Sequence, residues 1–249
     1  MELKRLLVLL VSTTSVFGQG AGLPPKESFF YNIEWRLFNA GKAQVDLTST
    51  GQPQSPPSYQ IKLHLESTGF VSKLFKVEDD YTSQLNENLC AESAHLLTQE
   101  GSRLRETRIT FDAEGKKANY LERDRAKNNA VVLAREIEIP SCVHDVVGGL
   151  FFLRTLNLEP GQTTQVAVSD GKKSVMAKVE AQAREEIKTA AGTFKTVRYE
   201  VYLFDNVLYK RPAHLNLWLS DDRRRLPVQI RVRMTFTIGT ITLQLEKHE

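Results

Sequence analysis

The stretch VQIRVRMTFTI at residues 228–238 decides the class of fold, because its side chains alternate strictly between apolar and polar. An extended chain places successive side chains on opposite faces, whereas a helix repeats about every 3.6 residues. Six apolar residues at every second position therefore predict a strand with one buried face. After Gly239, the residues Ile241, Leu243 and Leu245 repeat the pattern, which predicts an antiparallel hairpin in this part of the chain.

The same period of two recurs along most of the chain outside this stretch. Residues 31–47 are predicted to form a hairpin with its turn at 39–42, and residues 164–179 another with the turn SDGK at 169–172. Three prolines within residues 51–58 exclude ladder pairing there, so this segment is a loop. In all, about a dozen strands are expected.

Two segments break the alternation and indicate helices. Within residues 68–77, four apolar side chains lie at helical spacing, which predicts a short helix. The main helix is predicted at about 141–156, with Ser141 as a possible cap and Asp145 in the first turn. Its apolar stripe consists of Val143, Val146, Val147, Leu150 and Phe151. The pair Gly148-Gly149 weakens the helix, so close packing against a neighbour is expected.

These elements predict a mainly β protein, a large antiparallel curved sheet or an open β-barrel packed on one central helix at about 141–156. An outer-membrane barrel also alternates. Arg231 and Arg233 on the longest strand, together with the helix, argue against that architecture. We expect a single β-rich domain over residues 27–249.

The first residues are interpreted as a secretory signal peptide. Residues 1–18 (MELKRLLVLLVSTTSVFG) carry Lys4 and Arg5 before an apolar run, with small residues before a cut at Gln19. Residues 19–26 follow as a flexible lead-in rich in glycine and proline. No cysteine follows the apolar run, so lipidation is not expected. The prediction is a protein secreted across the inner membrane, soluble and periplasmic.

Composition excludes several classes of protein. The chain has 249 residues, 33 Lys and Arg against 30 Asp and Glu, and a net charge of +3. It has no apolar run near the roughly 20 residues of a membrane-spanning helix, so no transmembrane segment is expected in the mature chain. It also lacks the clustered basic excess of a nucleic-acid binder, so no nucleic-acid partner is expected.

Two cysteines, Cys90 and Cys142, remain in a chain predicted to be exported. An even count in an oxidising compartment favours a disulfide between them. Two buried free thiols are the first alternative. A reactive Cys142 with His144 as its base is the second, but the sequence offers no third group to orient the pair.

The sequence contains no readable active site. His144-Asp145 is interpreted as a helix start with a capping acid rather than half of a metal or acid–base site, because further ligands at readable spacing are missing. The charge run at 221–225 (DDRRR) fits a solvated hairpin turn, although it could bind an anion or a lipid head group. Without a Gly-rich phosphate loop or a nucleophile motif, no catalytic residue, metal site or cofactor is predicted.

Four motifs in series carry a family resemblance. Ile139-Pro140 with Asp145 and Leu153-Arg154 comes first. The others are LEPG at 158–161, TAAGTF at 189–194, and LWLSDD at 217–222 followed by LPV at 226–228. Together they resemble the bacterial domain-of-unknown-function family 3108, over most of the mature chain. The resemblance implies an exported envelope protein and carries no catalytic residues. At the level of fold alone, the chain is also similar to LolA/LolB-type periplasmic lipoprotein carriers.

The leading functional hypothesis is a non-enzymatic envelope protein that binds a lipid-like or apolar ligand inside the half-barrel. The candidate ligand-binding residues are Arg154, Phe151, Phe236 and Trp218. The alternative is a structural interaction module with a filled core and an envelope protein as partner, and a third is an enzyme acting on glycan or peptide. An apolar pocket above roughly 300 Å³ would favour the ligand-binding hypothesis, whereas a closed core would favour the module.

Overall fold

A computed structural model describes residues 23–36, 38–50, 57–234 and 239–249. The predicted signal peptide, the start of the lead-in and Phe236 therefore lie outside the described residues. The described chain folds into one 15-stranded sheet and two helices. No helix among these residues is long and apolar enough to cross a membrane.

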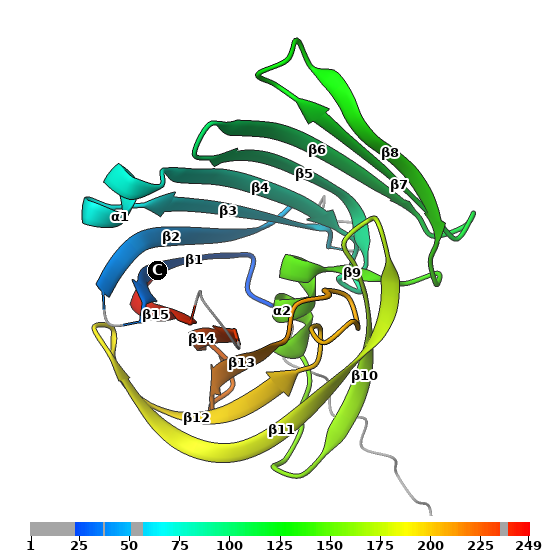
Figure 1. Ribbon diagram of the computed structural model, residues 1–249. Helices are drawn as coiled ribbons and strands as arrows, with labels where there is room; N and C mark the ends of the chain where they lie inside the picture. The colour runs from blue at the N-terminus through cyan, green and yellow to red at the C-terminus, as the bar shows by residue number, and fades with distance from the viewer. Residues whose placement is uncertain (1–22, 37, 51–56, 235–238) are drawn as a thin grey trace, which may run out of the picture.

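The first half of the chain is a meander of eight strands with one short helix (Figure 1). The predicted short helix is confirmed as α1, Gly69–Leu74. The strands are β1 (Lys26–Trp35), β2 (Phe38–Ser49), β3 (Tyr59–Ser67), β4 (Val77–Leu85), β5 (Ala91–Glu100), β6 (Arg103–Asp112), β7 (Lys117–Asp124) and β8 (Ala130–Glu138).

The second half contributes the other strands and the second helix, α2 (Val146–Leu153). Its strands are β9 (His144–Asp145), β10 (Thr163–Ser169), β11 (Ser174–Thr189), β12 (Gly192–Val201), β13 (Ala213–Ser220), β14 (Pro227–Met234) and β15 (Thr240–His248). The predicted hairpin around residues 169–172 is confirmed by the pairing of β10 with β11, and the C-terminal hairpin by the pairing of β14 with β15.

The order of strands joins the two halves through the first and last strands. It runs β8-β7-β6-β5-β4-β3-β2-β1-β15-β14-β13-β12-β11-β10-β9. All neighbours are antiparallel except β9 and β10, which are parallel. The sheet curls until β9 approaches β5, where the backbone N–H of Ala91 donates to the carbonyl of Val143 at 2.7 Å.

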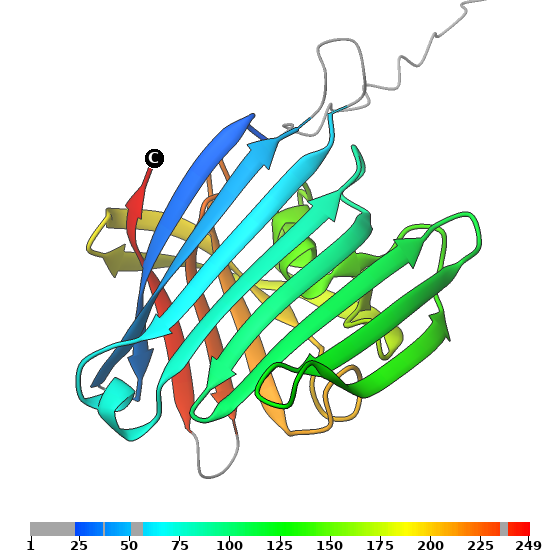
Figure 2. The same ribbon diagram turned by 90° about the horizontal axis from the view of Figure 1, so that it is seen from above.

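Strands β6–β8 extend past this point of closure and form a separate flap, here called the wing (Figures 1 and 2). The remaining strands, β1–β5 and β9–β15, are called the barrel body. Figure 1 places α2 on the concave side of the barrel body. Its contacts run to β4, β9 and β10. The fold is thus mainly β, a large curved and open antiparallel sheet.

The prediction of a helix over 141–156 was wrong in its extent. Residues 141 and 142 form a bend, and the chain is not helical before Val146, because the carbonyl of Val143 pairs with Ala91 and because residues 144 and 145 pair with β10 as strand β9. The N-cap is consequently Asp145 instead of Ser141. At the other end, Leu153 closes the helix and Arg154 is its C-cap.

The core has two clusters that meet at α2. Phe151 belongs to the cluster of β1–β7, β14 and β15, and its ring contacts Phe29 edge-on at 6.0 Å. Leu153, two residues later, belongs to the cluster formed by β10–β13. One short helix therefore contributes buried side chains to both halves of the sheet.

Candidate functional site

A cavity of about 240 Å³ lies on the concave side of the barrel body, against α2. Its wall is almost entirely apolar. It is lined by Tyr31, Val45, Leu63, Val146, Val147, Leu150, Phe151, Arg154, Leu203, Phe204, Tyr209, Leu215, Pro227, Ile230, Val232 and Leu243. The volume falls slightly below the roughly 300 Å³ at which drug-sized ligand pockets begin.

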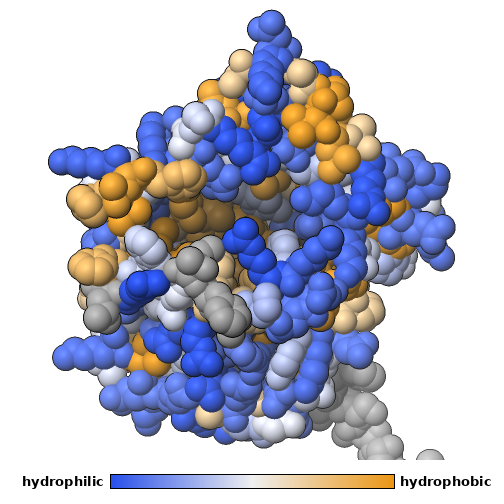
Figure 3. Space-filling view, viewed as in Figure 1, coloured by the Kyte–Doolittle hydropathy of each residue, from blue (hydrophilic) through white to orange (hydrophobic). Residues whose placement is uncertain are grey.

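The strands supply the wall of this cavity through their alternation. Val45, Leu63, Ile230 and Leu243 come from different strands, and each faces the concave side. Leu63, Ile230 and Leu243 are only half-buried although they point inward, since nothing packs against part of their surface. Figure 3 shows the result, a recess with apolar walls within a largely hydrophilic rim.

The end of the cavity at α2 is held in place by Asp145. One oxygen of its buried carboxylate accepts the backbone N–H groups of Val147 and Gly148 at 3.0 and 2.9 Å. The hydroxyls of Tyr81 and Ser83 on β4 donate to the two oxygens at 2.6 Å each. Burial, with the Asp145 charge, raises the pKa of Tyr81 well above its usual value, so the phenol remains a donor. Asp145 therefore caps α2 and ties it to the sheet.

The absence of a side chain at Gly148 leaves room for the Asp145 carboxylate and for Leu85 beside the first turn of α2. A Cβ at this position would lie 2.7 Å from Asp145 Oδ2 and 3.0 Å from Leu85. Gly148 therefore lies close both to the N-cap Asp145 and to Leu85 of β4.

His144 also has a structural position. Its Nδ1–H donates to the carbonyl of Leu89 at 2.7 Å, and its ring stacks on Phe152 with centroids 4.1 Å apart. Burial lowers the pKa of His144, which keeps the imidazole neutral. Among the described residues no group of three or more His, Cys, Asp or Glu could hold a metal ion. The pair His144-Asp145 thus anchors the start of α2.

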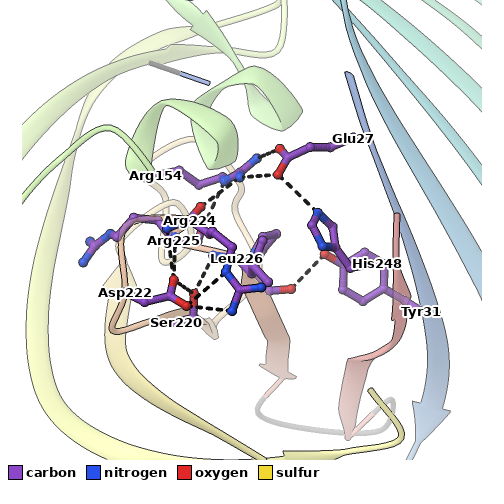
Figure 4. Close-up of polar contacts among 10 residues, drawn as sticks. Glu27, Tyr31, Arg154, Ser220, Asp222, Arg224, Arg225, Leu226 and His248 are labelled. Carbon is purple, nitrogen blue, oxygen red and sulfur yellow. Dashed lines mark hydrogen bonds and ion pairs between the residues drawn. The ribbon is translucent and has the colours of Figure 1, made fainter. Parts of the chain in front are cut away.

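Arg154 and Glu27 form a buried ion pair beside the cavity (Figure 4). The guanidinium donates to both carboxylate oxygens at 2.7 and 3.1 Å, and the side chains are 1% and 6% exposed. It also donates to the carbonyls of Arg224 and Arg225 at 3.0 and 3.1 Å. His248 Nε2–H donates to Glu27 at 3.2 Å. The charge of Arg154 is therefore compensated within the protein.

The hydroxyl of Tyr31, on the cavity wall, also has its hydrogen-bond partner within the protein. It donates to the carbonyl of Pro227 at 2.9 Å, and burial raises its pKa. Burial likewise raises the pKa of Tyr209 to about 12, with Asp170 adding to the effect. Both phenols stay neutral, so the wall is suited to holding an apolar group.

The predicted candidate residues are only partly brought together. Phe151 and Arg154 line the cavity, and Phe236 lies outside the described residues. Trp218 is three positions from the lining residue Leu215, so it points to the other face of β13. There its indole N–H donates to Glu185 at 3.0 Å, and Arg231 lies over its ring at 5.0 Å.

The disulfide Cys90–Cys142 is confirmed. The two Cα atoms are 5.2 Å apart, within the usual range for such bridges. It joins the turn before β5 to the segment before β9, next to the hydrogen bond between Ala91 and Val143. The bridge therefore fastens the point where the barrel body closes.

The charge run at 221–225 is an ordered turn. Asp222 accepts the backbone N–H groups of Arg224 and Arg225 at 3.0 and 3.3 Å and the Ser220 hydroxyl at 2.8 Å. Arg225 donates to the carbonyl of Leu156 at 2.9 Å. The turn thereby presents its carbonyls to Arg154, as Figure 4 shows.

Sequence reasoning missed Glu27, Tyr81 and Ser83. Glu27 had a readable signal, since it shares the face of β1 with Phe29 and Tyr31, where an acid needs a buried partner. Tyr81 and Ser83 had none, because their partner Asp145 lies more than 60 residues away.

Comparison with solved structures supports the open barrel. The described fold is similar to the crystal structure of a beta-barrel-like protein of domain of unknown function DUF1849 from Brucella abortus. The TM-score is 0.56 at 7% identity, over 91% of this chain and 98% of that chain, which shows likeness of fold alone. A putative exported protein with a YmcC-like fold from Bacteroides fragilis gives a TM-score of 0.39 at 9% identity, over 90% and 95% of the two chains.

No protein with a curated description matches the chain. The sequence model of the family described as "Protein of unknown function (DUF3108)" matches residues 31–246. That match covers all but the first 30 and last three residues of the 249-residue chain. The family resemblance is therefore confirmed, and the chain belongs to the family DUF3108.

Proposed function

We propose that this chain is an exported, non-enzymatic binding protein that holds one apolar group, such as the acyl chain of a lipid, in the cavity beside α2. The observation that carries the proposal is an open recess whose inward aliphatic side chains, such as Leu63 and Leu243, are left partly uncovered. A large, well-formed apolar pocket is the default binding site of a protein.

The size and chemistry of the cavity define the ligand class. A volume of about 240 Å³ exceeds the roughly 150 Å³ of an apolar cavity that binds benzene. It is small for a whole lipid, so the polar part of the ligand would remain outside. Arg154 is already paired with Glu27, and we therefore assign it to the wall rather than to a head group.

An oxidising, extracytoplasmic location fits this role. The disulfide Cys90–Cys142 is the kind of bridge that persists in the periplasm, and residues 1–18 have the pattern of a signal peptide. N-terminal sequencing of protein from the envelope fraction should find a start at or near Gln19. An intact Met1 on cytoplasmic protein would contradict this part of the proposal.

An interaction module with a filled core is the second candidate. The observations that favour it are the cavity volume below roughly 300 Å³ and the burial of Phe151, which is only 4% exposed. In that case the recess is a packing defect and binds nothing.

Binding of a fluorescent fatty acid distinguishes the two candidates. The protein should bind the probe saturably, and Leu63→Trp should weaken binding by roughly tenfold or more, because the indole fills the cavity. The matched control is Lys62→Trp, at the exposed neighbouring position on the other face of β3, which should bind as the parent protein does. Probe excitation outside the tryptophan band avoids interference. Absence of binding, or equal binding by both variants, would leave the filled module.

A further inference from the structure

The described surface carries a group of exposed large apolar side chains around α1. They are Phe38, Phe70, Leu74 and Phe75, with exposed fractions of 68, 72, 66 and 53%, and are called here the rim cluster. None of the residues of α1 is buried, so this helix does not belong to the core. Contiguous apolar surface of this kind marks an interaction site.

The rim cluster lies at one end of the barrel body. The backbone N–H of Thr68 donates to the carbonyl of Ala40 at 3.0 Å, which holds the start of α1 against β2, where Phe38 is the first residue. The ring of Phe75 lies against Gly101, in the turn between β5 and β6. The side chains of the rim cluster therefore project from α1 and from the ends of neighbouring strands.

The cavity opens at this same end. Figure 2 shows α1 at the end of the strands that faces the viewer of Figure 1, and Figure 3 shows the apolar recess from that side. An apolar group that leaves the cavity would therefore emerge beside the rim cluster.

The chemistry of the rim cluster fits a lipid surface. Residues 67–77 (STGFVSKLFKV) contain no acid and two lysines. Lys73 is exposed, forms no ion pair with the residues that the structure describes, and lies three residues after Phe70 and next to Leu74. Aromatic and leucine side chains combined with lysine are typical of helices that lie in the membrane interface, where lysine reaches the head groups.

We infer that the rim cluster docks on the surface of a lipid bilayer that contains anionic head groups, with the mouth of the cavity facing the membrane. The apolar side chains enter the interface and Lys73 meets the head groups, whereas Lys76 is already paired with Glu78 at 2.6 Å. The role that we assign to this docking, the transfer of an acyl chain between bilayer and cavity, rests on the proposed function. The docking itself is tested independently of that function.

Co-sedimentation of the mature protein with vesicles tests the docking. Vesicles of phosphatidylcholine with phosphatidylglycerol should retain the protein, and retention should persist in part at high salt, because apolar insertion is not screened. Phe70→Ser with Leu74→Ser should lower the partition coefficient at least roughly tenfold, since burial of two large side chains is lost. The matched control is Val131→Ser with Val132→Ser, which removes two exposed apolar side chains, 57 and 48% exposed, from β8 and should change nothing.

Three outcomes would overturn the inference. They are no retention of the parent protein, retention that Phe70→Ser with Leu74→Ser leaves unchanged, and retention lost completely at high salt. Circular dichroism of each variant checks that it is folded.

Failure of docking and failure of ligand binding are distinguishable. The variant with serine at 70 and 74 should bind a soluble fluorescent fatty acid normally but take it up from vesicles more slowly. Leu63→Trp should dock normally but take up much less of the fatty acid, in line with its weaker binding. Normal uptake from vesicles by the serine variant would contradict the docking inference while leaving the cavity proposal intact.

Discussion

The barrel body and the wing belong to one sheet, yet their strands are buried to very different degrees. In β13 of the barrel body six of eight residues are buried, whereas in β8 of the wing eight of nine are exposed. β8 is not poor in apolar residues, since it includes Val131, Val132 and Leu133 in succession. The difference is the layer that lies opposite, because α2 faces the barrel body and not β8. Apolar residues in a strand therefore do not ensure that it is buried, because burial depends on what packs against it.

The base of the wing is intermediate in burial between β13 and β8. The hairpin between β10 and β11 covers it, with Lys172 over the ring of Tyr120 at 5.2 Å and Gly171 against Ile109. Beyond this cover the inner face is charged, and Arg105 contacts Asp124 at 2.5 Å and Glu122 at 3.2 Å. Ion pairs therefore stabilise the outer part of the wing, whereas apolar packing stabilises the barrel body.

The largest loss of stability is expected when the buried ion pair of the barrel body is broken. Arg154→Met leaves the Glu27 carboxylate buried without its partner, which should lower the free energy of unfolding by about 3–5 kcal/mol. Adding Glu27→Gln should restore part of the loss. The matched control in the wing is Arg103→Met, which removes half-exposed ion pairs and should cost less than about 1 kcal/mol. Urea unfolding measures both, and equal losses would remove the distinction between the two regions.

Removal of the disulfide should have the next largest effect. Cys90 and Cys142 are 52 residues apart, and such a bridge stabilises by about 2–4 kcal/mol, mainly by restricting the unfolded chain. Cys90→Ala with Cys142→Ala should therefore lower the urea midpoint. Thiol titration of the denatured, unreduced parent protein should find no free thiol. A midpoint unchanged by reduction would show that the closure of the barrel body does not need the bridge.

Asp79, on β4 of the barrel body, should give a smaller and pH-dependent effect. Burial raises its pKa from 3.8 to about 6, with Glu100 and Asp80 adding to the shift. The folded state thus binds the proton more tightly than the unfolded state, and stability is lost as pH rises from about 4 through about 6. Asp79→Asn, which can still accept the Gln99 N–H, should be more stable than the parent by about 1 kcal/mol at neutral pH, after allowance for solvent screening. The two proteins should be equally stable below about pH 4, and a difference that persists there would refute the assignment.

The smallest effect is expected at the edge of the wing. Val131→Ser with Val132→Ser should change the free energy of unfolding by no more than about 0.5 kcal/mol, because both side chains are exposed. The matched change in the barrel body is Val168→Ser on β10, which is buried and should cost about 2 kcal/mol. A large loss from the β8 variant would mean that another molecule covers the wing under the conditions of the assay.

The sequence predicted the strands well because alternation is a local signal. The hairpins at 31–47 and 164–179 and the short helix α1 all follow from neighbouring residues. The turn predicted at 39–42 was wrong, because Trp35 already pairs with Phe38 and residues 39–42 lie within β2. The helix at 141–156 was predicted too long, because the disulfide and the pairing of β9 hold residues 141–145 outside the helix through distant partners. The existence of an element can thus be predicted locally, while its ends depend on tertiary contacts.

The candidate site was less accessible to prediction. Phe151 was found because it lies on the apolar stripe of the helix. Trp218 is an odd number of positions away from the inward residues Leu215 and Leu217. Alternation along the strand therefore already placed it on the other face. The pairing of Arg154 with Glu27 spans 127 residues, and no local pattern in one sequence encodes such a contact.

The pairing of β1 with β15 also sets the order of folding events. Tyr31 lies opposite Leu245, so the two halves of the sheet cannot pair through β1 and β15 until the last strand has been synthesised. Contacts of such high sequence separation require a large loss of chain entropy before they gain any energy, and proteins that depend on them fold slowly. Until that contact forms, β1 and β14 both have unpaired edges that can associate with other chains. The step most exposed to aggregation is therefore the arrival of the final strand, rather than the formation of either half.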